Sequence, residues 1–458
     1  MIPFGLLGGF CDHLEIRITG LWEKGFSFRV PEKIEKAACL EICFFDFSAD
    51  CYRKVQLAEK EREMKLTEET PFFFIYSVWT KNGEYREQVK RLVTDYDNYI
   101  SLKLAGDDAY LSEKMVGYPA ELDEVYAESF EEQKKEWFSC VGDGIQECRN
   151  TWEHKKWNIT DFPEFELAIT IDRPELYYDF LQKDWTRFCH DYWKNNFLEH
   201  HTLSKKRVTR IYIGNQFCHN LFPRKKLLFQ VLEKALENNL AVTLAFSYIR
   251  NHLLEEIDEL LQELEVWCQS REKEAGKDQE EIIVNDWAMP ILLQGKPHLK
   301  PVLGVLLNKR RKDVRLPYKQ GIGNHVDSLA ENNLNCGFYQ DYLKNTFDIQ
   351  RFEFESCGYK VTIPDGHHSL HLPFFQTNTS QYCTLYAVCR YGDRGKQKLP
   401  ENCPKYCEQK VFLYPKHLKM VGRYNSLFGY DEKILWDEKQ LQDYLEQGID
   451  RIVVNVSL

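Results

Sequence analysis

Four closely spaced cysteines lie in the C-terminal part of the sequence, at Cys383, Cys389, Cys403 and Cys407. They follow an apolar segment, residues 370–374, that predicts a strand, and the sequence among them contains glycine and proline, as loops do. A loop at the end of a sheet has little core to fill, so four thiols there are better explained as metal ligands than as packing. Cysteine thiolates bind iron-sulfur clusters or zinc. Structural zinc usually has its cysteines in short-spaced pairs, and only Cys403 and Cys407 form one, so the spacing favours a cluster over zinc or free buried thiols.

A fifth cysteine, Cys218, follows an apolar segment at residues 210–214 that predicts another strand. The carboxyl ends of parallel strands meet at one rim of a sheet, and sites form there. Cys218 is therefore expected at the same rim as the cysteine loop. The alternative is an inert thiol in the core.

The region from residue 164 onward alternates predicted strands with amphipathic helices, which is typical of βα units around a parallel sheet. About seven such units predict an α/β fold with a TIM-like barrel, complete or partial. The helices are expected at residues 227–236, 253–264 and 441–445. The strands are expected at residues 210–214, 241–246, 282–284, 302–306, 352–354, 370–374 and 452–456.

The N-terminal part has a different pattern. Residues 1–105 contain short β-branched and aromatic segments separated by turn signals, which predicts a small antiparallel β-barrel. Asn82 followed by Gly83 predicts a hairpin turn within it. Residues 106–163 are acidic with apolar residues at helical spacing, and we expect a helical connector to a TIM-like iron-sulfur domain at residues 164–458. The N-terminal strands are expected at residues 14–19, 26–30, 39–45, 72–79 and 99–104.

The composition is that of an ordinary globular protein. The 458 residues exceed the size at which one core stops growing, roughly 250 to 300 residues, so at least two domains are expected. A formal charge of −11 makes nucleic acid an unexpected default partner. No apolar run is long enough to cross a membrane, and the first residues lack the basic region of a signal peptide. Fifteen cysteines in such a chain indicate a reducing compartment, so a cytoplasmic location is expected.

The strand and cysteine motifs together carry a resemblance to a known family. Ile211-Tyr-Ile-Gly-x-x-x-Cys218, with the spacing of Cys389, Cys403 and Cys407, resembles the collagenase-like U-type peptidase family, most closely its members in anaerobic ubiquinone biosynthesis. The resemblance covers about residues 207–458 and implies that these four cysteines bind a 4Fe-4S cluster. The interval from Cys389 to Cys403 is shorter than in those members, and Cys383 has a counterpart only elsewhere in the family. Either Cys218 or Cys383 is therefore the fourth ligand.

The same resemblance implies an activity. Family members include oxygen-independent hydroxylases of a quinone precursor, hydroxylases of bases in ribosomal or transfer RNA, and proteins named as peptidases. We expect an oxygen-independent hydroxylase or a subunit of one, which acts on a small molecule or RNA and requires a protein partner. The alternatives are a regulatory or structural protein in which the cluster staples the barrel, and a peptidase. The sequence contains neither a His-Glu-x-x-His nor a Gly-x-Ser-x-Gly motif, which argues against the peptidase.

Asn285 and Asp286 follow the predicted strand at residues 282–284. We take Asp286 as a candidate catalytic residue that binds substrate or moves a proton, in a pocket at the strand ends with Trp287 and Asn308. The alternative, which an Asn-Asp pair after a strand favours, is that Asp286 caps the N-terminus of a helix.

Two other polar groups invite a site and have simpler explanations. His368 and His371 would face opposite sides of one strand, so a second metal site there is not expected. The basic run at residues 309–312, with Arg315, is expected to be a solvated face, with anion binding as the alternative.

The N-terminal barrel resembles a PilZ domain through residues 20–28. PilZ domains that bind cyclic di-GMP use an arginine pair before the barrel and a serine in the loop that follows. Here Trp22 occupies the serine position, and Arg17 is the only arginine upstream. Cyclic di-GMP is therefore expected to bind weakly or not at all, and a docking or scaffolding role is expected for this part of the chain.

Overall fold

The computed structural model describes residues 7–12, 14–34, 37–46, 51–70, 73–105, 134–135, 137, 162–275, 279–310, 312, 330–393, 396, 398–400, 402–413, 419–431 and 433–457. These residues belong to two compact units, an N-terminal one that contains residues 7–105 and a C-terminal one that contains the rest. Most of the connector predicted for residues 106–163 lies outside the described residues.

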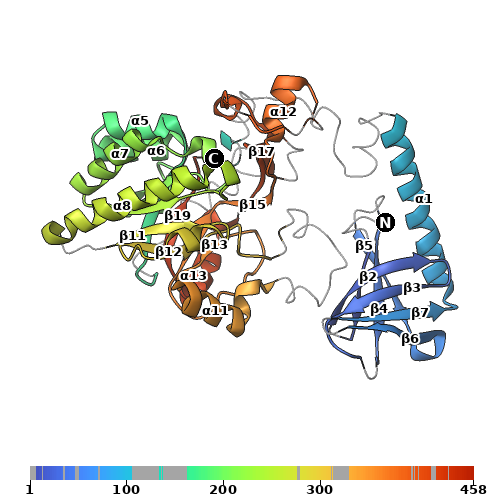
Figure 1. Ribbon diagram of the computed structural model, residues 1–458. Coiled ribbons are helices and arrows are strands. Elements are labelled where there is room, and N and C mark those ends of the chain that lie inside the picture. Colours follow the sequence, from blue (N-terminus) through green and yellow to red (C-terminus); the bar gives the residue numbers. More distant parts are fainter. Residues whose placement is uncertain are drawn as a thin grey trace. The chain divides into compact units, whose positions relative to one another are not determined.

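The N-terminal unit is a seven-stranded antiparallel sheet, in the order β5-β4-β1-β2-β3-β7-β6, with one long helix beside it (Figure 1). The predicted antiparallel arrangement is confirmed, with β5 and β6 at the two ends of the strand order in the described part of this unit. Its elements are β1 Leu7–Cys11, β2 Leu14–Trp22, β3 Gly25–Val30, β4 Leu40–Asp46, β5 Cys51–Leu57, β6 Arg62–Glu69, β7 Phe74–Thr80 and α1 Gly83–Ala105.

The strand expected at residues 99–104 is wrong, because these residues belong to α1. Asn82 does not form a hairpin turn either: its Oδ1 accepts a hydrogen bond from the backbone N–H of Tyr85 (2.9 Å), as an N-cap does. Tyr85, Val89 and Leu92 are buried in the core of the sheet, and their spacing is that of one helix face. The helical spacing of apolar residues after Asn82 indicates this helix, but the Asn-Gly pair was interpreted as a hairpin turn.

Asn82→Ala is expected to lower the free energy of unfolding of the N-terminal unit by about 1 kcal/mol, because the first turn of α1 loses its cap. Urea unfolding followed by circular dichroism measures this change. Asn82→Asp keeps an oxygen at the same place and should leave the stability close to that of the wild type. Equal stability of the alanine variant and the wild type would contradict the capping role.

The C-terminal unit is built on an eight-stranded sheet of parallel strands, in the order β12-β11-β10-β9-β8-β19-β14-β13. The sheet nearly closes into a barrel, since Leu303 at the end of β12 bridges Phe352 just before β13. The expected α/β fold with a barrel of parallel strands is thereby confirmed. The strands are β8 Glu166–Ile171, β9 Arg210–Gly214, β10 Ala241–Ala245, β11 Glu280–Val284, β12 Leu299–Leu303, β13 Glu353–Glu355, β14 His368–Leu372 and β19 Ile449–Val454.

Helices surround this barrel because each has one apolar face (Figure 1). In α7, for example, Leu228, Val231, Leu232 and Ala235 are buried at helical spacing. The helices are α5 Pro174–Gln182, α6 Trp185–Asn195, α7 Lys225–Glu237, α8 Leu254–Ala275, α9 Met289–Leu292, α11 Gly337–Phe347 and α13 Glu438–Glu446.

The interior of the barrel is layered. Apolar side chains and Tyr212 form the middle layer. Charged side chains near the starts of four strands form an ion-pair layer at the N-terminal end of the barrel. In this layer Arg451 contacts Glu281 (2.6 Å) and Glu166 (2.6 Å), and Arg210 contacts Glu166 (3.0 Å). The interior of the barrel therefore has paired charges at its N-terminal end and polar groups at its C-terminal end.

Between β14 and β19 the chain leaves the barrel in an excursion that holds four of the five candidate cysteines. Four of its strands form a small antiparallel sheet in the order β15-β18-β17-β16. The sequence predicted only a loop here. The elements are β15 Phe374–Thr379, α12 Thr384–Tyr391, η11 Tyr406–Glu408, β16 Phe412–Leu413, β17 Met420–Arg423 and β18 Ser426–Tyr430.

Candidate metal centre

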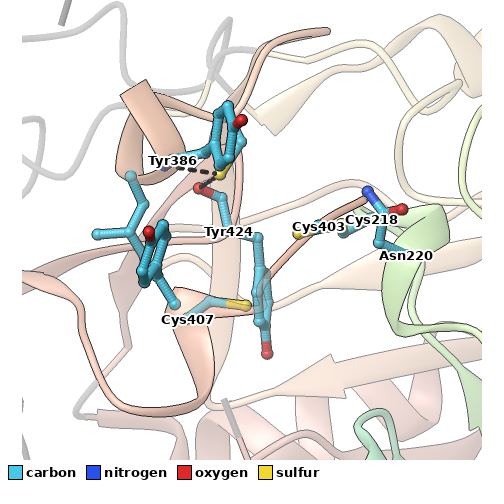
Figure 2. Close-up of a pocket in the computed structure, with 9 residues that line it drawn as sticks. Cys218, Asn220, Tyr386, Cys403, Cys407 and Tyr424 are labelled. Atoms are coloured by element: carbon cyan, nitrogen blue, oxygen red, sulfur yellow. Dashed lines mark hydrogen bonds between the residues drawn. The ribbon is translucent and has the colours of Figure 1, made fainter. Parts of the chain in front are cut away.

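Four cysteine side chains line one pocket, which is partly open to solvent. They are Cys218, from the loop after β9, and Cys383, Cys403 and Cys407, from the excursion. Figure 2 shows three of these cysteines gathered around Tyr424. The remaining walls come from Asn220, Leu385, Tyr386, Tyr406 and Tyr424.

The pocket lies at the C-terminal end of the barrel strands. Cys218 comes four residues after the last residue of β9. Tyr248, which follows β10, donates a hydrogen bond from its hydroxyl to the backbone oxygen of Ser380 (3.2 Å) and accepts one from Asn425 Nδ2 (3.0 Å). These contacts hold the excursion against the C-terminal ends of the strands. This is the rim at which Cys218 was expected from the sequence.

Cys218 is held by its own loop. Asn215 Oδ1 accepts hydrogen bonds from the backbone N–H groups of Phe217 and Cys218 (both 2.9 Å). Gly214 has a φ of +108°, and a Cβ there would lie 2.6 Å from the backbone oxygen of Ala245, so glycine is required at this turn. The turn directs the chain, and with it Cys218, toward the excursion.

Cys383 and Cys407 are held by backbone hydrogen bonds. Cys383 precedes α12 as its N-cap, and its Sγ accepts a hydrogen bond from the N–H of Tyr386 (3.3 Å) while the thiol donates to the backbone oxygen of Tyr424 (3.0 Å). Cys407 lies in η11, where Arg423 Nε donates to its carbonyl oxygen (3.0 Å). An N–H at a helix start stabilises a thiolate, so Cys383 is well placed as a ligand.

The protein environment keeps these thiols protonated in the absence of a metal. Burial raises the pKa of Cys218 to about 11 and that of Cys383 to about 12, and it raises the pKa of Cys407 further. Cys403 adds to the increase in all three. Ligation by a cation would offset this cost with the release of protons.

Cys389 does not line the pocket. It lies on α12, six residues after Cys383, and six helical residues correspond to about 9 Å along the axis. Burial raises its pKa and Lys410 opposes the increase, while none of the pocket cysteines acts on it. Both Cys218 and Cys383 therefore line the pocket and Cys389 does not, whereas the family resemblance implied Cys389 as a ligand.

Among the described residues, no three His, Cys, Asp or Glu side chains converge closely enough to hold a single metal ion. In a four-iron cluster each thiolate binds a different iron, so its ligands do not share one ion. The chemistry of the donor set, four thiols that line one pocket and of which Cys407 is buried, fits such a cluster.

Tyr424 has an unusual backbone conformation for an aromatic residue. Its φ of +57° lies in the left-handed region, in the turn between β17 and β18. Such a conformation costs on the order of 1–3 kcal/mol and is kept where surrounding contacts require it. Here the backbone oxygen of Tyr424 contacts Cys383, and its side chain lines the cysteine pocket. The strained backbone therefore positions Tyr424 as one wall of the pocket.

Asp286 has a structural role. Its Oδ1 accepts hydrogen bonds from the backbone N–H groups of Ala288 and Met289 (both 3.0 Å), and its Oδ2 accepts one from Ile249. These bonds stabilise the turn before α9, whose N-cap is Ala288, and a catalytic role for Asp286 stays a prediction. Of its expected neighbours, Trp287 is 42% exposed, while Asn308 is buried and donates to the backbone oxygen of Glu353 (3.2 Å).

The two histidines of β14 face opposite sides, as expected. The ring of His368 stacks on Phe352 with 4.8 Å between ring centroids. His371 points into the barrel, where its Nε2 lies 2.5 Å from Glu353 Oε2. This buried pair was not expected, although Glu353 alternates with Phe352 and Phe354 in the expected strand, which was a signal of a polar side chain facing inward.

The described residues of the basic run differ in exposure: Lys309 is exposed, as expected for a solvated face, whereas Arg310 and Lys312 have partners within the protein. Lys312 is buried against Glu355, and Arg310 donates to the backbone oxygen of Glu355 and contacts Cys357 Sγ (2.7 Å). For Arg310 and Lys312 the expectation is wrong, because Glu355 and the nearby polar atoms provide partners for both cations. Arg311 and Arg315 lie outside the described residues.

Comparison of the chain with protein-family models, with curated proteins and with solved structures finds no match. The resemblances to the collagenase-like peptidases and to PilZ domains stay predictions. Among the described residues, no helix is long and apolar enough to cross a membrane.

Proposed function

We propose that this protein binds a 4Fe-4S cluster through Cys218, Cys383, Cys403 and Cys407 and serves in redox chemistry. The observation that carries the proposal is that four thiols from two separate segments face one pocket at the C-terminal end of the barrel. That end is where sites in folds of parallel strands form.

Four cysteine ligands occupy all four irons, so the cluster would supply electrons and would not coordinate substrate. A reaction would then take place beside it. Gln216, Asn285 and Asn308 bring buried amide groups to the barrel mouth and are suited to orient a small organic substrate. An oxygen-independent hydroxylase, or a subunit of one, is the activity that the family resemblance implies.

A structural role is the second candidate, and one observation favours it. Cys218 belongs to a loop of the barrel, whereas the other three cysteines belong to the excursion, so a cluster would tie the two together. Reversible one-electron reduction of the bound cluster, without loss of iron, would support the redox role. A cluster that cannot be reduced without unfolding the protein would support the structural one.

Purification without oxygen tests the proposal. The full-length protein is expected to be brown and to contain about four irons and four acid-labile sulfides per chain. A paramagnetic signal should appear on reduction with dithionite. Colourless protein with one zinc per chain would contradict the proposal and identify the pocket as a zinc site.

A further inference from the structure

A chain of buried polar side chains leads from the cysteine pocket into the barrel. Gln216 lies two residues before Cys218, in the same loop. Its Nε2 lies 3.5 Å from Nε2 of His371, on β14, and His371 Nε2 lies 2.5 Å from Oε2 of Glu353, on β13. Gln216, His371 and Glu353 are all buried. The loop that presents a cysteine to the pocket is thus connected to a buried acid-base pair.

Gln216 is itself held in place. Asn285 Nδ2 donates to Gln216 Oε1 (3.3 Å) and to the backbone oxygen of Phe246 (2.8 Å). The amide of Gln216 therefore bridges two strand ends and the histidine. Gln216 is thus the side chain that connects the loop of Cys218 to His371.

The titratable groups beyond His371 and Glu353 keep the same protonation state near neutral pH. Tyr212, on β9, donates to Glu353 Oε1 (3.0 Å), and burial raises its pKa, so it stays neutral. Arg451, on β19, donates to the Tyr212 hydroxyl (3.1 Å) and stays cationic. Burial opposes ionisation of Glu281, on β11, but Arg210 and Arg451 lower its pKa to about 2, so it stays anionic.

One further charged pair lies along β13. Glu355 is paired with Lys312, and their side chains are 3% and 7% exposed. Burial lowers the pKa of Lys312, and Glu355 opposes that decrease. His371 is the histidine that the Gln216 loop contacts, and an imidazole can carry a proton on either ring nitrogen.

We propose that His371 and Glu353 together take up one proton when the centre held by the four cysteines gains one electron. The inference rests on the proposed function, which supplies the redox centre. The step balances: a one-electron donor protein provides the electron, solvent provides the proton, and the pair gains one N–H or O–H bond. Its physical cause is Coulombic, because negative charge added near a buried pair favours a positive charge on that pair.

The reduction potential of the cluster in anaerobically purified full-length protein tests this proposal. The potential is expected to fall as pH rises between about pH 6 and pH 9, toward 59 mV for each tenfold change in proton concentration. His371→Gln keeps a hydrogen-bonding group beside Glu353 and is expected to remove most of that slope. His368→Gln is the matched control, because it replaces a buried histidine on the same strand that faces away from the barrel interior, and it should keep the wild-type slope.

Infrared difference spectra of the wild type, reduced minus oxidised, in H₂O and D₂O provide a measurement that needs no substitution. Bands of imidazole or carboxyl protonation are expected on reduction. An intact cluster with a potential independent of pH, or an unchanged slope in His371→Gln, would overturn the inference and leave the proposed function standing. Protein that contains no iron and sulfide would overturn both.

Discussion

Cys383→Ser is expected to remove most of the iron and sulfide from anaerobically purified protein, because the substitution takes away one of the four thiols that face the pocket. A serine oxygen is a poor ligand for iron in a cluster, and the site would hold only three thiolates. Iron and sulfide assays, with the visible absorbance of the same samples, measure the loss. Cys218→Ser should have the same effect.

Cys389→Ser is the matched control, since it removes a cysteine of the same excursion that lies outside the pocket. This variant is expected to keep wild-type iron and sulfide. The opposite result, with the cluster lost in Cys389→Ser and kept in Cys383→Ser, would restore the ligand set that the family resemblance implies. It would also mean that α12 changes its position when a cluster binds.

Glu281→Gln is expected to destabilise the barrel by roughly 3 kcal/mol at pH 7. Glu281 contacts both Arg451 (2.6 Å) and Arg210 (3.3 Å), and its side chain is 12% exposed. Removing one partner of a buried ion pair leaves the other charge without compensation, which costs about 3–5 kcal/mol. The midpoint of urea unfolding measures the difference from the wild type.

The pH dependence of this difference follows from the sign of the pKa shift. Burial opposes ionisation of Glu281, but the two arginines lower its pKa from the ordinary 4.5 to about 2. A lowered pKa in the folded state contributes stability that is fully present above about pH 4.5 and is lost as pH falls toward 2. The destabilisation by Glu281→Gln should thus be constant from about pH 8 to pH 5 and smaller at about pH 3.

Glu263→Gln serves as the control for this prediction. Glu263 pairs with Lys225 on the surface, where their side chains are 42% and 61% exposed. Exposed pairs contribute little, so a change below about 0.5 kcal/mol is expected. If both glutamine variants were equally stable, the ion-pair layer would not be what stabilises the start of the strands.

The barrel could be predicted from local patterns because strands and helices have periods that the sequence displays. The apolar segment at residues 210–214 became β9, and the helical spacing of Leu228, Val231 and Leu232 became α7. The helix α1 was missed because Asn82 and Gly83 also satisfy the pattern of a hairpin turn, and only the hydrogen bond from Tyr85 to Asn82 decides between the two. Local composition leaves that choice open.

The candidate cysteine ligands likewise depended partly on the sequence and partly on the tertiary structure. Their residue type and short spacing were enough to expect a metal ligand set, and the strand before Cys218 was enough to place it at the rim of the barrel. Which four thiols meet depended on tertiary structure. Cys383 and Cys389 are six residues apart in sequence, but α12 carries Cys389 away from the pocket while the contact with Tyr424 holds Cys383 in it.

Charge gave the least reliable local signal. The basic run was expected to be solvated, but Lys312 is paired with Glu355. Glu353 and His371 are buried together because the closure of eight strands places them inside the barrel. The sequence by itself determined the residue types, the periods of the elements and the rim at which Cys218 lies. Only tertiary structure decided which charges are paired, because burial and partnership depend on strands that are far apart in the chain and adjacent in the sheet.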